Sequence, residues 1–333
     1  MSLGIVIIGR NEGERLVRCL GSIATDSQTA YVDSGSTDSS IAAALSAGAT
    51  VIELDLATPF TAARARNAGR AALSPDCEFI QFVDGDCMLQ PGWLAAGAAA
   101  LQADVSLAAV FGRRREVAPD ASRYNWMCDT EWAVPSGPSR YFGGDVMLRS
   151  AAFDEAGGYP AEMIAGEEPD LAIRLRAKGW RIACLPVEMT LHDAAIARFG
   201  QWWRRATRSG HAYAELADRH RAQGLGDYQR RAASVLFWGA ALPALALALI
   251  AIGLVAAQPL SAIVGLALLA LPLLQLARLA LREKRRRSAK DAAFMALFLM
   301  LAKPAQSLGI AQYWIGRLFG RRARIIEYKQ GVA

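Results

Sequence analysis

The chain has 333 residues, of which 53% are hydrophobic, and it carries a formal net charge of +6. This length allows a sizeable core and one or two domains, and the apolar content points towards a membrane component. The basic excess lies after about residue 198, beside apolar runs, which suggests a membrane surface or phosphate-rich substrates; no nucleic-acid-binding motif is present.

The five cysteines are an odd number without CxxC spacing, so a disulfide framework or a zinc site is not expected, and reduced cytosolic thiols fit better. Cys87 is interpreted as a small packing residue. The apolar stretch from Leu3 to Ile8 is too short for a signal peptide and has no basic region before it. It is expected to be a first buried strand, with the soluble part of the chain remaining in the cytoplasm.

The first part of the chain alternates between strand-like and helix-like stretches. Strands are expected over residues 3–8, 29–33, 49–54 and 79–84, each followed by a helical segment. This alternation predicts a parallel sheet with helices on both faces, in which ligands bind beyond the carboxyl ends of the strands. Asp33 and Asp84 end two of these strands, so they are expected to line one crevice.

The most informative stretch is the fourth strand, which ends in Asp84-Gly85-Asp86. Carboxylates are suitable ligands for hard divalent cations such as Mg²⁺ or Mn²⁺. The glycine allows a tight turn and leaves room for a phosphate beside the backbone. On its own, a short acidic turn is also common at solvated strand ends, so the surrounding sequence must decide between these interpretations.

Three motifs in order carry a resemblance to a known family. Arg10-Asn11-Glu12 follows the first strand, the loop from Asp33 to Asp38 follows the second, and Asp84-Gly85-Asp86 follows the fourth. Together they resemble the ordered signatures of family 2 glycosyltransferases, over roughly residues 1–215. The resemblance implies the GT-A fold, a nucleotide-binding α/β sandwich with a mostly parallel central sheet, and a nucleotide-sugar donor.

The resemblance also implies roles for individual residues at the donor site. Asp84 would meet the ribose, or the metal through water, and Asp145, in a glycine-rich strand, would contact a sugar hydroxyl. The other nucleotide-sugar-binding residues that it implies are Asn11, Glu12, Asp33, Asp38 and Arg66. From the residues alone, Asp33 and the loop after it are equally consistent with a turn and a helix cap.

A second acidic group, Glu167, Glu168 and Asp170, surrounds Pro169. Proline and acids suit the first turn of a helix, so capping is the simpler interpretation. Three acids in four positions exceed what capping requires, and like charges near a crevice raise one pKa, which suits a general base. The resemblance places the base at Glu168, where the family usually has Asp; Glu167 could share the role.

His192 follows a final expected strand over residues 180–185. A single histidine is often structural. The resemblance nevertheless implies a metal-binding histidine at this point, which would complete a site with Asp86 and Asp84. Because imidazole accepts Mn²⁺ better than Mg²⁺, His192 would shift the preference of the expected divalent cation towards manganese.

Two arginine-rich stretches could contact the acceptor. Arginines 113–115 could meet phosphates or form a solvated edge. Trp202, Trp203, Arg204 and Arg205 lie in an amphipathic helix of the kind found at lipid headgroups, and they are expected at the acceptor and membrane interface.

The C-terminal part is expected to enter a membrane. Residues 235–257 and 260–277 form a charge-free helical hairpin, and the basic run over residues 282–287 places its end in the cytoplasm. An apolar stretch interrupted at Lys303-Pro304 is expected to form a re-entrant or interfacial helix pair before a basic tail, with a third span as the alternative. The expected domains are residues 1–215 (catalytic), 216–234 (linker), 235–281 (two spans) and 282–333 (basic loop, membrane helix and tail).

These features lead to one expected function and two alternatives. The expected function is an inverting, metal-dependent glycosyltransferase in the cytoplasmic membrane, with its catalytic domain facing the cytoplasm. It would move a sugar from a nucleotide-sugar to a membrane-associated, lipid-linked acceptor in polysaccharide or glycolipid biosynthesis; inversion is implied by the resemblance. The alternatives are a polyprenyl-phosphate monosaccharide synthase and an inactive membrane scaffold, which the intact acidic motifs oppose.

Overall fold

The computed structural model describes residues 2–23, 27–223 and 226–320. The chain divides into two compact units, with the boundary between Arg198 and Phe199. The catalytic segment expected from the sequence, residues 1–215, therefore includes most of a helix, α8 (Phe199–Arg219), that the contacts group with the membrane-type helices. Each unit is described by itself.

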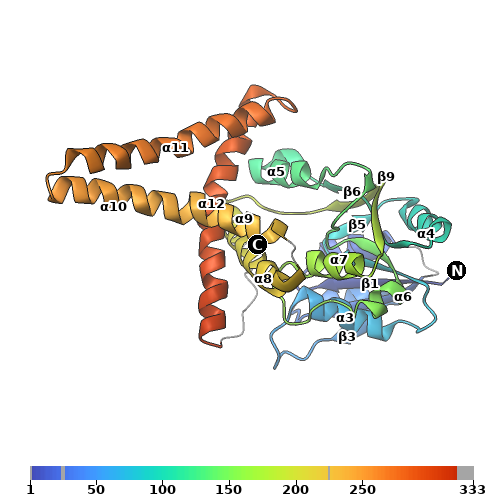
Figure 1. The fold of residues 1–333 in the computed structure, drawn as a ribbon. Helices are drawn as coiled ribbons and strands as arrows, with labels where there is room; N and C mark the ends of the chain where they lie inside the picture. Colours follow the sequence, from blue (N-terminus) through green and yellow to red (C-terminus); the bar gives the residue numbers. More distant parts are fainter. Residues whose placement is uncertain (1, 24–26, 224–225, 321–333) are drawn as a thin grey trace. The chain divides into compact units, whose positions relative to one another are not determined.

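The first unit is built on a nine-stranded mixed sheet in which the N-terminal strands run parallel (Figure 1). The strand order is β3-β2-β1-β4-β8-β6-β9-β5, with β7 beside β9. The parallel strands of the first half are β1 (Leu3–Gly9), β2 (Gln28–Asp33), β3 (Thr50–Glu53) and β4 (Phe79–Asp84). Because β2 and β4 both flank β1, the ends of β2 and β4 lie at one edge, as expected.

The second half of the sheet is mixed. Its strands are β5 (Cys87–Leu89), β6 (Leu107–Glu116), β7 (Gly137–Pro138), β8 (Val146–Arg149) and β9 (Arg181–His192). Strand β8 runs antiparallel between β4 and β6, whereas β6 and β9 are parallel. The last strand is longer than the sequence predicted, and it ends on His192 itself.

The helices of the first unit follow the strands. They are α1 (Glu14–Gly21), α2 (Ser40–Ser46), α3 (Ala62–Ala72), α4 (Trp93–Ala103), α5 (Arg123–Trp132), α6 (Ser150–Glu155) and α7 (Glu167–Ala177), with a 3₁₀ turn, η1 (Pro119–Ala121), before α5. Helix α3 begins after Thr61, whose hydroxyl accepts a hydrogen bond from the Arg64 amide at 3.0 Å. Gly69 lets α3 approach the sheet closely, because a Cβ there would lie 2.2 Å from Val6 Cγ1.

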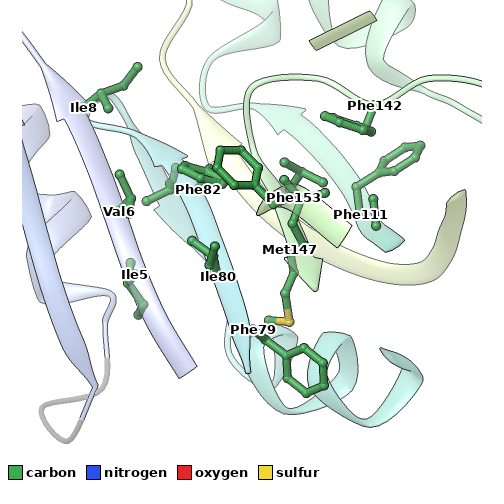
Figure 2. Packing of buried hydrophobic residues seen from close by; sticks show 14 of the residues in the cluster. Ile5, Val6, Ile8, Phe79, Ile80, Phe82, Phe111, Phe142, Met147 and Phe153 are labelled. Atoms are coloured by element: carbon green, nitrogen blue, oxygen red, sulfur yellow. The ribbon is translucent and has the colours of Figure 1, made fainter. Parts of the chain in front are cut away.

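The hydrophobic core extends along β4 and its neighbouring strands β1 and β8 (Figure 2). Phe82 is fully buried, with its ring centroid 5.4 Å from that of Phe153 and 5.5 Å from that of Tyr159. Met147 and Ile80 are also fully buried. The three rings form one aromatic cluster, which fixes the strand two residues before Asp84.

The second unit is helical. It consists of α8, a 3₁₀ turn η2 (Arg221–Gln223), α9 (Gly226–Leu236), a π-helical turn η3 (Phe237–Ala241), α10 (Leu242–Val255), α11 (Pro259–Glu283) and α12 (Ala289–Leu318). Among the described residues, three helices are long and apolar enough to cross a membrane: Gly226–Val255, Pro259–Glu283 and Ala289–Leu318. The expected hairpin is formed by α10 and α11, which lie side by side (Figure 1).

Helix α12 differs from the expected helix pair. It is one continuous helix that contains Pro304, so the interruption predicted at Lys303-Pro304 was wrong. Tertiary packing explains the continuity: Ala305 is fully buried, and Gly309 lies so close to α8 that a Cβ would come 1.9 Å from the Thr207 carbonyl oxygen. Figure 1 shows α12 running across the base of the α10–α11 hairpin. The predicted basic tail, residues 321–324, lies outside the described residues.

Candidate active site

The site is centred on the tip of β4, where Asp84 lies between two arginines. Its Oδ1 is 2.9 Å from Nη2 of Arg66, and its Oδ2 is 3.4 Å from Nη2 of Arg114. Arg66 comes from α3 and Arg114 from β6, so elements on both sides of β4 meet at this carboxylate. Two cationic partners favour the ionised form of Asp84.

Arg66 joins the tip of β4 to the start of α7. Its Nη1 is 3.0 Å from Oε1 of Glu167 and 3.5 Å from Oε1 of Glu168, and its guanidinium lies over the Tyr159 ring at 5.5 Å. The side chain is almost fully buried, and the surrounding carboxylates outweigh burial and raise its pKa, so it stays protonated. The sequence predicted a nucleotide contact for Arg66; the structure places its guanidinium in contact with three carboxylates.

Gly144 leaves the space that the Arg66–Asp84 pair occupies. A Cβ at this position would lie 2.6 Å from Arg66 Nη2 and 2.8 Å from Asp84 Oδ2. At the preceding residue, Gly143, the nearest atom would be 3.9 Å away. The requirement for glycine is therefore specific to the residue beside the ion pair.

Asp145 stabilises the end of β4 through a hydrogen bond with its backbone. Its Oδ1 accepts a hydrogen bond from the Asp84 amide at 3.0 Å, and its Oδ2 accepts one from the Thr190 hydroxyl at 2.8 Å. Arg114 Nε lies 3.4 Å from the same Oδ2. The carboxylate is fully buried, so in this arrangement Asp145 acts on the site through Asp84, where the sequence had suggested a sugar-hydroxyl contact.

Of the three adjacent arginines predicted as a cluster, Arg114 enters the site. Arg113 Nε and Arg115 Nη1 instead lie 3.9 and 3.6 Å from Oε1 of Glu188, and Arg115 also pairs with Asp129. The alternation of side chains along β6 separates Arg114 from its neighbours. One member of the run thus contacts the acidic cluster, and the other two lie on the opposite, partly exposed face of β6.

The three acids predicted as a catalytic group occupy the first turn of α7, where they have different environments. Asp170 is buried and pairs with Arg174 at 2.7 Å. Glu167 is buried against Arg66, and among the described residues its Oε2 has no hydrogen-bond partner. Glu168 retains 18% side-chain exposure.

Glu168 has a higher pKa than an ordinary glutamate. Burial, together with the charge of Glu167, raises its pKa from 4.5 to about 7, against the opposing effect of Arg66. A carboxyl that titrates near neutral pH is partly ionised there and binds a proton more strongly than an ordinary glutamate.

Asp86 and His192 belong to one of two groups, among the described residues, that could hold a cation; the other is formed by Asp84, Cys87 and Asp145. Asp86 Oδ2 lies 3.5 Å from His192 Nε2, and the pairing of Cys87 with His192 between β5 and β9 brings them together. The ligand atoms of Asp86, Cys87 and His192 lie within 4.8 Å of one another. Burial raises the pKa of the Cys87 thiol, which fits the packing role predicted for it.

The donor set fits a divalent cation. A carboxylate oxygen and an imidazole nitrogen are compatible with Mn²⁺, and imidazole is a poorer ligand for Mg²⁺. His192 is held on its other side: its Nδ1 lies 3.9 Å from Oε2 of Glu116, and its ring meets Trp132 edge-on at 4.6 Å. A carboxylate behind a histidine orients the ring of a metal ligand. Sequence reasoning missed Glu116, although it ends a strand as Asp33 and Asp84 do.

The predicted nucleotide-binding residues at the other end of this edge form two interlocked loops. Asn11, with a φ of 54°, accepts a hydrogen bond from the Thr37 amide at 2.7 Å through Oδ1. Asp33 is buried and accepts hydrogen bonds from the amides of Gly35 and Ser36 at 2.8 and 2.7 Å. The loops after β1 and β2 are thus joined, and Asp33 has the turn-forming contacts that were the simpler interpretation.

The remaining predicted residues are distributed as follows. Glu12 pairs with Arg15 at 2.9 Å, and Asp38 accepts a hydrogen bond from the Ser40 amide at 3.0 Å. The predicted acceptor residues belong to α8 in the second unit; there Trp202 is buried against Phe298, with ring centroids 4.8 Å apart. The other three are less buried: Trp203, Arg204 and Arg205.

Comparison with known proteins identifies the first unit. Residues 4–157 match the family model "Glycosyl transferase family 2". This stretch of the first unit is similar to glycosyltransferase family 2. The family resemblance of the three sequence motifs is thereby confirmed, and the match includes the tip of β4 and Asp145 but ends before α7.

A curated relative and two solved structures are similar to this chain. The pre-mycofactocin glycosyltransferase of Mycobacterium tuberculosis is 29% identical over 168 residues, covering 47% of this chain and 35% of that protein. The alignment thus spans about a third of the relative's length. A mannosyltransferase from Pyrobaculum calidifontis, in complex with GDP-Man and Mn²⁺, has a TM-score of 0.54 at 17% identity, covering 95% of this chain and 87% of its own.

Glucosyl-3-phosphoglycerate synthase from Mycobacterium tuberculosis, in complex with Mn²⁺, UDP and glucosyl-3-phosphoglycerate, is 18% identical, with a TM-score of 0.49, over 66% of this chain and 79% of that one. The likeness to the mannosyltransferase establishes the fold, so the GT-A fold expected from the sequence is confirmed, together with C-terminal apolar helices.

Proposed function

We propose that the protein is an inverting, metal-dependent glycosyltransferase that transfers a sugar from a nucleotide-sugar to an acceptor at a membrane. The observation that carries this proposal is the position of Arg66, which binds both Asp84 at the tip of β4 and the pair Glu167 and Glu168 on α7. Asp84 and the pair on α7, which would have different tasks in the reaction, are thereby held at one edge of the sheet.

The donor would lie across the loops after β1 and β2, with Asn11, Glu12, Asp33 and Asp38 near the nucleotide. Asp86 and His192 would hold the cation at the diphosphate. A bound Mn²⁺ supplies Lewis acidity and neutralises charge on the departing nucleoside diphosphate. Asp84, fixed by Arg66 and Arg114, lies two residues from Asp86 and would meet the ribose or the metal through water.

Glu168 would act as the general base. Its carboxylate takes the proton of the acceptor hydroxyl as that oxygen attacks the anomeric carbon on the face opposite the leaving nucleotide. The bond from the anomeric carbon to the diphosphate breaks as the new glycosidic bond forms, so the configuration inverts. The pKa of about 7 lets Glu168 exist as the carboxylate at neutral pH and still hold the proton that it receives.

The base also separates this proposal from a polyprenyl-phosphate monosaccharide synthase. A phosphate acceptor is already ionised and needs no base, whereas a hydroxyl acceptor does. The raised pKa of Glu168 therefore favours a hydroxyl on a lipid-linked sugar or glycolipid. An inactive scaffold is opposed by the intact cluster of ionic contacts around Asp84.

We further propose that the helix Gly226–Val255, which ends in α10, and α11 each cross the cytoplasmic membrane, with the catalytic domain in the cytoplasm. The hairpin is long and apolar enough to cross, and basic residues 282–287 follow it on the side where its chain returns. Helix α12 would lie along the membrane surface, because it runs across the base of the hairpin (Figure 1). Trp203, Arg204 and Arg205 would face lipid headgroups and acceptor.

The proposal is tested by the release of nucleoside diphosphate from a panel of UDP-, GDP- and dTDP-sugars, with the full chain in native lipid extract. We expect one donor to be turned over with Mn²⁺ and not with EDTA. Asp86→Ala should lower the rate at least about 100-fold, because it removes a metal ligand. Asp120→Ala, which changes an exposed acid, is the matched control. Turnover that is insensitive to EDTA and to Asp86→Ala would refute the metal-dependent mechanism.

A further inference from the structure

The second unit contains a cavity that none of the features above explains. Its volume is about 520 Å³, and it lies between α8, α9 and α12. The polar residues that matter for its chemistry are Tyr213, Asp227, Arg230, Arg231, Lys303 and Gln306. Arg230 and Arg231 are exposed and Lys303 is half-buried, so this space opens at the surface of the helical unit, where it is accessible to a ligand.

The cavity has more positive charge than its own acid can balance. Arg230 pairs with Asp227 at 2.8 Å. Arg231 lies near the faces of Tyr213 and Tyr228, at 5.9 and 5.7 Å, and within the described part of the chain neither Arg231 nor Lys303 forms an ion pair with a carboxylate. Two cations from different helices therefore line one space without an anion between them.

Gln306 adds hydrogen-bonding capacity that the protein does not use. Its Oε1 is buried, and among the described residues it has no hydrogen-bond partner. Gln306 follows Lys303 by three residues, so both side chains lie on one face of α12. The Gln306 oxygen is a hydrogen-bond acceptor, so its partner would be a donor group of the ligand, whereas the ammonium of Lys303 and the guanidinium of Arg231 would bind an oxyanion.

Backbone packing makes this arrangement rigid. Gly239, in the π-helical turn, approaches α12 so closely that a Cβ would lie 2.3 Å from the Lys303 carbonyl oxygen. The Ser307 hydroxyl donates a hydrogen bond to the Val235 carbonyl at 3.2 Å. These contacts hold α12 against the junction of α9 and α10, and π-helical turns often occur at functional sites.

The position along the chain indicates which anion would reach the cavity. Arg230 and Arg231 lie in the first turns of the apolar helix Gly226–Val255, where a spanning helix meets the headgroup layer. Phosphate is the principal anion of that layer. We propose that this cavity binds the phosphate group of a membrane lipid through Arg231 and Lys303. That the bound lipid is also the sugar acceptor rests on the function proposed above, and the binding itself does not.

The test measures binding without a nucleotide-sugar, so its failure is distinct from failure of the proposed function. Native mass spectrometry of the full chain in neutral detergent would follow the addition of farnesyl phosphate, with farnesol and inorganic phosphate as separate probes. We expect farnesyl phosphate to bind, and Arg231→Gln and Lys303→Gln each to weaken it about tenfold or more, because each removes a charge-assisted hydrogen bond.

Two variants sharpen the result. Lys303→Arg should retain binding because it retains the charge, and Arg286→Gln should not change it because Arg286 is exposed and outside the cavity. Unchanged farnesyl phosphate binding in both Arg231→Gln and Lys303→Gln would overturn the proposal. Equal binding of farnesol would show that the phosphate is not recognised, and equal binding of inorganic phosphate would show a free-anion site; either result would also overturn it.

Discussion

At the scale of single residues, the acids of the site are visible in the sequence because each occupies a recognisable position. Asp33 and Asp84 end strands, and Glu167 and Glu168 begin a helix. The role of Arg66 could not be predicted in this way. Its partners Asp84, Glu167 and Glu168 lie 18, 101 and 102 positions away, so only the folded chain shows that one buried guanidinium joins them.

The same limit applies to glycine. The sequence marks Gly143 and Gly144 as a pair, and only the structure shows that Gly144 alone borders the Arg66–Asp84 contact. We predict that Gly144→Ala displaces this ion pair and lowers turnover at least about tenfold, with a cost in folding free energy of about 1–3 kcal/mol from overpacking. Nucleoside-diphosphate release and thermal unfolding measure the two effects. The control Gly143→Ala should change neither, and equal behaviour of the two variants would show that the close contact at Gly144 does not matter.

At the scale of elements, the periodic strands and helices of the first unit were predicted well because their hydrophobic patterns are local. The antiparallel insertion of β8 between β4 and β6 was not, since strand order depends on contacts distant in sequence. For helix α12, the sequence predicted a break that the structure does not contain. Proline usually interrupts a helix, but here close packing against α8 keeps the helix continuous across Pro304.

This explanation of α12 has a direct test in the second unit. Gly309→Ala would place a methyl group 1.9 Å from the Thr207 carbonyl oxygen, so α8 and α12 would have to separate. We expect the thermal unfolding midpoint of this variant in detergent to fall, because overpacking lowers the free energy of unfolding by about 1–3 kcal/mol. Gly200→Ala on α8 meets no atom within 4 Å and serves as the control. An unchanged midpoint for Gly309→Ala would mean that this helix contact does not stabilise the unit.

At the scale of the whole molecule, composition alone indicated a membrane component, and three sufficiently long apolar helices agree with it. The number of crossings depends on how α12 lies in a bilayer, which hydropathy does not determine. The choice of acceptor likewise depends on the shape and charge of the protein surface that binds it, which no short sequence motif defines.

The proposed topology predicts which positions are reachable from outside the cell. Single cysteines at Gln258→Cys, between α10 and α11, and at Arg285→Cys, after α11, would be treated with a membrane-impermeant maleimide. The first should react in intact cells and the second only after permeabilisation. The five native cysteines are buried and provide a low background in the parent chain. The reverse pattern would place the catalytic domain outside.

The central claim is that Glu168 takes the acceptor proton, and the pH dependence of kcat/KM tests it most directly. Because its pKa is raised to about 7, the carboxyl is protonated and inactive as a base below that pH, so the rate should rise through pH 7 and level off above it. Glu167→Gln removes a charge that raises this pKa and should move the inflection to lower pH. Glu168→Gln should lose about 100-fold or more in rate together with the inflection. A rate in Glu168→Gln that keeps both its size and its inflection near pH 7 would contradict the claim.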